Sequence, residues 1–168
     1  MKHLMLSLLL LPPTLLYAAT DTSPDASFYK KVAEAGMAEV DAGNLASEKA
    51  SDAKVKDFAA MMVKDHTEAN DKLKTLAESK GIKLPGGASI AEKAEYAKLK
   101  VLSGNTFDKS YIKGQIKAHR TVLAELKKEI ASGQDADAKA FAQTVLPTIQ
   151  AHLKAANSIA AADGVTTK

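Results

Sequence analysis

Four long segments of this chain place their apolar side chains three and four residues apart. This spacing follows the 3.6-residue turn of an α-helix, so each segment predicts a helix with one apolar face. The segments span about residues 23–48, 51–80, 106–131 and 135–162. Apolar faces of similar length must be buried against one another, and four of them are typical of a four-helix bundle. Since no alternating strand pattern competes with this interpretation, the sequence predicts an all-α fold.

Residues that start helices lie at the ends of these segments. Ser23 before Pro24 suits the start of the first helix, and Asp135 can cap the last one. Ser89 and Glu92 have the spacing of a capping box. They predict a short extra helix over about residues 89–102, in the connection between the second and third long helices.

The first nineteen residues differ from the rest of the chain. A lysine precedes an apolar run from Leu4 to Leu16, and Ala18 and Ala19 supply small residues for cleavage. This is the pattern of a secretory signal peptide. The run is short and interrupted by two prolines, which argues against a membrane anchor. We therefore expect cleavage near Ala18 or Ala19.

The remaining residues, 20–168, are expected to form one helical-bundle domain with its core over about 25–162. The signal peptide predicts a periplasmic or secreted protein, and no other apolar run is long enough to span a membrane. The absence of cysteine excludes disulfides, thiolate ligands and cysteine nucleophiles. Basic and acidic residues number 23 and 20 and are interleaved, so the charge pattern does not predict nucleic-acid binding.

Each of the four apolar faces contains one polar residue near its middle. These residues are Glu39, His66, His119 and His152. His3 lies in the signal peptide, so all three histidines of the mature chain take part. Because the midpoints of packed helices of similar length share a level, the four side chains are expected to meet in the core.

Such a cluster needs partners, since an unpaired buried polar group costs on the order of a few kcal/mol. A metal ion would satisfy three neutral imidazoles and one carboxylate together, and this donor set suits Zn, Fe, Mn or Cu. We therefore predict a metal site with Glu39, His66, His119 and His152 as ligands. The alternative is a metal-free cluster that sets helix register or responds to pH, in a structural or interaction protein of the cell envelope.

The pattern differs from the carboxylate-bridged di-iron bundles, which use Glu-x-x-His on two helices. Val63, Ile116 and Ile149 stand three residues before the three histidines. The sequence also lacks a phosphate-binding glycine loop, a nucleophile elbow and a His-Glu-x-x-His motif. Hydrolase, kinase and dehydrogenase chemistry are therefore not predicted, and a binding role is favoured over an enzymatic one.

Two glycines and an asparagine lie close to these positions. Gly36 and Gly43 stand about one turn on either side of Glu39, where glycine costs helix stability. We expect them to allow close packing of backbones or to leave room for a ligand. Asn70 lies one turn after His66 and is a candidate hydrogen-bond partner for a ligating histidine.

Three stretches of the chain resemble one bacterial family of exported proteins, the domain of unknown function 4142. The stretches are "AEAGMAEVDAGNLASEKASDAKVKDFAAMMVKDHTEAN", "LSGNTFDKSYI" and "LPTIQAHL", and the resemblance covers about residues 27–160. It implies a ferritin-like fold, in which residues 81–104 would cross over between the second and third long helices. It implies no established reaction. The characteristic polar positions of the family match Glu39, Asp65, His66, Asp108, Tyr111, His119 and His152.

Overall fold

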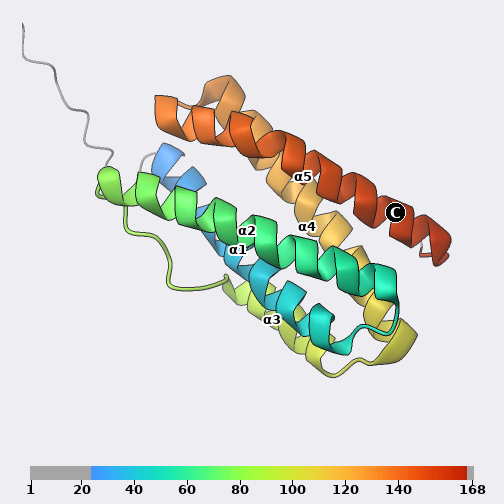
Figure 1. Cartoon of the computed structure of the whole chain (residues 1–168). Coiled ribbons are helices and arrows are strands. Elements are labelled where there is room, and N and C mark those ends of the chain that lie inside the picture. Colours follow the sequence, from blue (N-terminus) through green and yellow to red (C-terminus); the bar gives the residue numbers. More distant parts are fainter. Residues whose placement is uncertain (1–23, 166–168) are drawn as a thin grey trace, which may run out of the picture.

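The computed structural model describes residues 24–165, which form five helices (Figure 1). The signal peptide expected at residues 1–19 and its cleavage site lie outside the described residues. The helices are α1 (Pro24–Lys49), α2 (Ala53–Ser79), α3 (Ile90–Lys100), α4 (Gly104–Ser132) and α5 (Ala136–Ala162). The all-α prediction is confirmed, and the helix boundaries agree with the expected ones to within about two residues.

Two of the predicted helix caps are present, whereas Ser23, expected at the start of the first helix, lies outside the described residues. Ser89 and Glu92 form the reciprocal hydrogen bonds of a capping box at the start of α3. Asp135 accepts a hydrogen bond from the backbone N–H of Asp137 at the start of α5. These bonds satisfy N–H groups that a helix N-terminus cannot pair internally.

The long helices form two hairpins joined by a crossover that runs the length of the bundle. α1 packs mainly on α2, and α4 mainly on α5. At one end, the Asp108 carboxylate near the start of α4 accepts hydrogen bonds from the backbone N–H groups of Ser51 and Asp52, between α1 and α2. At the other end, Asp25 of α1 accepts one from the N–H of Gln134, between α4 and α5. The chain therefore returns past α3 before it starts α4, as a ferritin-like bundle requires (Figure 1).

The buried face of α1 agrees only in part with the one that the apolar spacing predicts, which consists of Phe28, Val32, Ala35, Glu39, Ala42 and Ala46. Phe28, Glu39 and Ala46 are buried. Val32, Ala35 and Ala42 are half-buried, whereas Gly36 and Gly43 are buried. A Cβ added at Gly43 would stand 2.8 Å from Cγ2 of Val63 and 3.2 Å from the backbone oxygen of Ala59. α1 therefore turns its smallest residues toward α2, which confirms the expected close approach of the two backbones.

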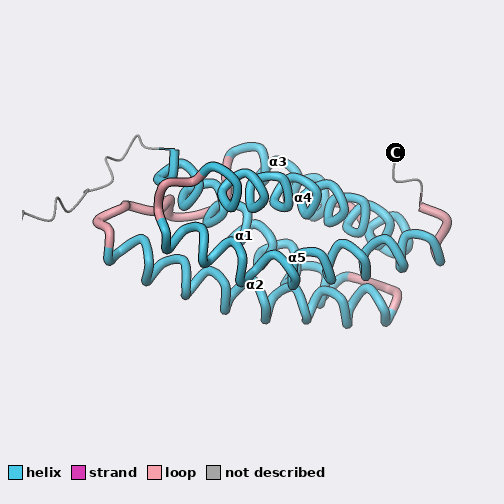
Figure 2. Tube along the Cα trace, turned by 90° about the horizontal axis from the view of Figure 1, so that it is seen from above, coloured by secondary structure: helices cyan, strands magenta, loops and turns pink. Residues whose placement is uncertain are grey.

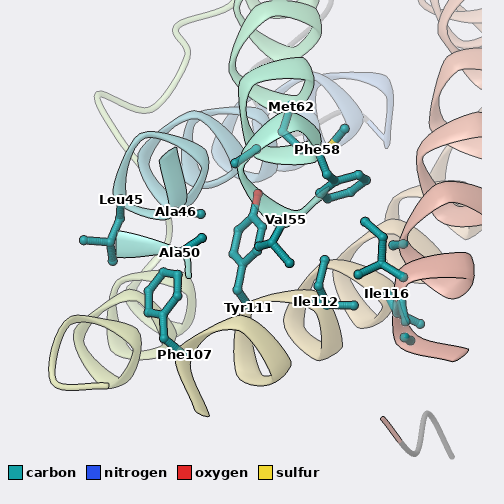
Figure 3. Close-up of a cluster of buried hydrophobic side chains, with 14 residues drawn as sticks. Leu45, Ala46, Ala50, Val55, Phe58, Met62, Phe107, Tyr111, Ile112 and Ile116 are labelled. Carbon is teal, nitrogen blue, oxygen red and sulfur yellow. The ribbon is translucent and has the colours of Figure 1, made fainter. Parts of the chain in front are cut away.

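The apolar core forms two clusters at the two ends of the bundle. One surrounds Tyr111 and contains Phe58 and Ile112 near the α1–α2 connection (Figure 3). The other surrounds Leu73 and contains Phe28 and Phe141 near the α4–α5 connection. Seen from above, the four long helices run side by side along their length (Figure 2). The polar residues at the helix midpoints lie between the two clusters.

None of the helices within residues 24–165 has both the length and the hydropathy of a membrane-spanning segment.

Replacing Gly43 with alanine tests the close packing of α1 on α2. Alanine gains about 1 kcal/mol in helix propensity over glycine, whereas overpacking costs about 1–3 kcal/mol. Val63 is β-branched and stiff within its helix, so it gives way poorly. We expect Gly43→Ala to lower the free energy of unfolding in urea. Gly114→Ala on α4 meets no atom within 4 Å and is expected to raise it; an equal gain in both variants would contradict close packing.

A second prediction concerns two buried carboxyl groups at the end of the bundle. Burial, a hydrogen bond that protonated Glu129 donates to the Asp25 carboxylate, and the charges of Asp25 and Asp135 raise the pKa of Glu129 from 4.5 to about 7, against a smaller opposing effect of Lys139. The folded state therefore keeps a proton that the unfolded chain loses between these pH values. Its stabilising contribution is complete below pH 4.5 and is lost as the pH rises through about 7.

Glu129→Gln keeps this group neutral at every pH. Its melting temperature is expected to rise relative to the parent protein as the pH increases from 5 to 8. Glu125→Gln, in which a partly exposed partner of Lys31 is changed, should show no such trend. A constant offset for Glu129→Gln across this pH range would show that the folded state does not keep an extra proton on Glu129.

Candidate metal centre

The four polar residues predicted from the sequence all lie in the core. Glu39, His66, His119 and His152 expose 5%, 6%, 1% and 1% of their surface. They come from α1, α2, α4 and α5, one from each long helix. Because each lies near the middle of its helix, the bundle holds them at a similar height.

Three of the four side chains meet. The ring centroids of His66, His119 and His152 lie 5.4–5.6 Å from one another. Each offers one ligand atom such that the three atoms lie within 4.8 Å of one another. The structure therefore brings together three imidazoles from three helices, two of which, α4 and α5, form one hairpin.

The hydrogen bonds of His119 determine which ring nitrogen is free. Nδ1 lies 2.8 Å from the backbone oxygen of Gln115, one turn earlier on α4. A carbonyl oxygen can only accept, so Nδ1 must carry the hydrogen. In the neutral ring, Nε2 then holds a lone pair and no hydrogen.

His152 is oriented by a different partner. Its Nε2 lies 2.9 Å from Oδ2 of Asp65 on α2. The carboxylate accepts, so Nε2 donates and Nδ1 of the neutral ring holds the lone pair. This Nδ1 faces Nε2 of His119 at 3.4 Å. Two hydrogen-bond acceptors therefore point at each other in the core.

The pKa values of all three histidines favour the neutral ring. Burial and the two neighbouring histidines lower the pKa of His66 to about 3. Burial lowers the pKa of His119 to about 4, although the bond to Gln115 opposes this shift. Burial also lowers the pKa of His152, against the attraction of Asp65. At neutral pH the cluster therefore presents neutral imidazoles, which is the form that binds metals.

A proton or a metal cation between the two nitrogens would remove the repulsion between their lone pairs. The lowered pKa values of the histidines disfavour the proton. Two imidazole nitrogens bound tetrahedrally at about 2.0–2.1 Å from one ion are about 3.3–3.4 Å apart. The separation between His119 and His152 has this value. In addition, Nε2 of His66 is buried and has no hydrogen-bond partner among the described residues. The donor set therefore fits a metal ion, provided that His66 approaches the other two.

Glu39 reaches the cluster from another side. Its Oε1 lies 3.7 Å from Nδ1 of His119, the nitrogen that carries the hydrogen. Burial raises the pKa of Glu39 to about 7, while a hydrogen bond from the Gln115 side chain opposes this shift. Glu39 is thus a neighbour of His119, and the three-nitrogen group does not include it. Its Oε2 is buried without a partner in the described part of the chain.

The remaining polar positions have separate roles. Oδ1 of Asn70 stands 2.0 Å from where a Cβ at Gly36 would lie, so Asn70 occupies the space that this glycine leaves. Asp108 binds the backbone at the α1–α2 connection. The sequence pattern did not identify Asp65 as a partner of His152, because Asp65 lies beside the apolar face of α2. Its position directly before His66 was a signal only through the family resemblance.

The chain belongs to a family of undetermined activity. The model of this family, described as Domain of unknown function (DUF4142), matches residues 12–159. No curated protein matches the sequence.

Two solved structures share the fold. A DUF305 protein from Streptomyces coelicolor superposes with a TM-score of 0.75 at 15% identity, covering 89% of this chain and 99% of that one. A DUF305 fragment from Deinococcus radiodurans gives 0.72 at 13% identity, covering 82% and 95%. At this identity the likeness shows the helical-bundle fold and leaves the chemistry to the site itself.

Proposed function

We propose that this member of the DUF4142 family is an exported protein that binds one transition-metal ion in the core of its helical bundle. His66, His119 and His152 would be the ligands. The observation that carries the proposal is the pair of imidazole nitrogens, on His119 and His152, that face each other at 3.4 Å with their hydrogens directed elsewhere. A metal ion turns this unfavourable contact into two bonds.

The surrounding groups support the ligands. Asp65 holds His152 through Nε2, and the Gln115 carbonyl holds His119 through Nδ1. Such partners set the tautomer and increase the basicity of the ligating nitrogen. Glu39 beside His119 would balance part of the charge that a cation brings into the core. Direct ligation by Glu39, as the sequence predicts, is the other role open to it.

The donor set narrows the choice of metal. Imidazole nitrogens suit Zn, Cu and Fe, whereas Mn prefers oxygen ligands. No cysteine is available to select a soft ion. We therefore expect Zn or Cu to bind more tightly than Mn. A protein that binds such an ion could take part in metal handling or stress defence.

Export is supported by the pattern of residues 1–19 and by the Streptomyces coelicolor structure, which is described as a candidate secreted protein. An exported metal-binding bundle would meet its ion in the periplasm or outside the cell.

Metal content is the direct test. The untagged protein should bind about one equivalent of Zn or Cu per chain by elemental analysis after dialysis. His66→Ala and His119→Ala should lose this metal while keeping the helical circular dichroism spectrum, whereas Glu125→Gln should retain it. EDTA should lower the melting temperature of the parent protein, since a ligand at 100 times its Kd adds about 2.7 kcal/mol of stability.

If Zn, Cu, Fe and Mn all fail to bind stoichiometrically, the metal-free structural role is the correct one.

A further prediction concerns Asp65. Removing its carboxylate frees the His152 ring to rotate, so Asp65→Ala should weaken metal binding about 10–100-fold without changing the stoichiometry. Competition with a chromophoric chelator would measure this affinity. Asp71→Ala removes an exposed carboxylate from the same helix and is the matched control. Equal affinities in the two variants would show that Asp65 does not position His152.

A further inference from the structure

A pocket of about 160 Å³ opens between α2 and α5, directly beside the histidine cluster. The residues that bear on its function are Asp65, His66, Ala69, Thr148, Ile149 and His152. Two of the three proposed ligands therefore line it. His119 and Glu39 are not part of the lining, so the pocket reaches the cluster from a side that Glu39 does not cover.

Three protein nitrogens leave one position of a tetrahedral ion unfilled. Catalytic zinc sites have this composition, with three protein ligands and an exchangeable fourth one, whereas structural sites fill all four positions with protein. His66, whose Nε2 has no hydrogen-bond partner among residues 24–165, is one of the residues that line the pocket. A ligand entering here would approach an ion held by the three histidines.

The walls of the pocket restrict the size of this ligand. Ala69 and Ile149 are apolar, and Thr148 brings a hydroxyl group. A water molecule takes about 30 Å³ in the liquid, so the pocket holds a group the size of a few waters. A ligand of a few heavy atoms therefore fits in the pocket.

The charge of the site determines the kind of ligand. A divalent ion held by three neutral imidazoles would keep both of its positive charges, and the Asp65 carboxylate on His152 and Glu39 beside His119 would balance only part of this charge. The Glu68 carboxylate at the pocket is paired with Lys72 at 2.7 Å. A cation in a buried site attracts a small anion, because an uncompensated charge there is costly.

We infer that the pocket between α2 and α5 admits a small monoanion of a few atoms to the open position of the three-histidine metal ion. This inference rests on the proposed function, since it needs the metal. The fourth ligand of the metal ion would then be exchangeable, unlike in a purely structural site. This ligand would enter between α2 and α5.

Azide binding to the Cu²⁺-loaded protein tests the inference. Azide should produce a saturable absorption change as it binds the ion. Ala69→Phe fills the pocket and should weaken azide binding at least tenfold with one Cu²⁺ still bound. Thr148→Tyr adds a bulky side chain to the pocket from an exposed position of α5. It replaces Ala69→Phe in this test if that variant does not fold. Ala60→Phe, at an exposed position of α2, is the matched control and should bind azide like the parent protein.

Two results would overturn the inference alone: a Cu²⁺-loaded protein whose spectrum does not respond to azide, and a pocket-filling variant that binds azide as tightly as the parent. Failure of the parent protein to bind any of the four ions, Zn, Cu, Fe and Mn, is a different result. It removes the proposed function and this inference with it.

Discussion

The contact between His119 and His152 is the constraint on which the rest of the site depends. Each ring donates its hydrogen outward, to a backbone carbonyl in one case and to Asp65 in the other, so two lone pairs face each other in the core. Burial disfavours the extra proton that would relieve them. Apolar packing alone does not explain this arrangement, because polar groups without hydrogen-bond partners are costly in a protein core. A bound cation, as in the proposed metal site, would make the arrangement favourable.

The bundle supplies the precision that this contact requires. The crossover past α3 lets α2 and α4 run in the same direction, and Asp108 ties the start of α4 to the α1–α2 connection. Gly43 lets α1 lie close against α2. Apolar clusters above and below the histidines hold the helices in register. A site on rigid helices keeps its ligands placed more closely than a site on loops would.

Much of this architecture could be predicted from local sequence patterns. Apolar spacing located the long helices, and Ser89 and Asp135 marked helix starts, because capping depends on residues that are neighbours in the chain. The meeting of three histidines followed from their positions at helix midpoints. The buried face of α1 was predicted only in part, because counting apolar residues gives no weight to glycines that allow close packing. The role of Asp65 could not be derived, since its partner His152 is 87 positions away in the chain.

The sequence by itself determined that the chain forms long amphipathic helices and that each buries one polar residue at half its length. Both properties arise from the periodicity of single helices, so no knowledge of neighbouring helices is needed. Only the tertiary structure decided which nitrogen of each imidazole is free, that Glu39 contacts the hydrogen-bearing side of His119, and that a pocket reaches the cluster between α2 and α5. These features depend on the rotation and offset of one helix against another, which the packing of all four faces sets together.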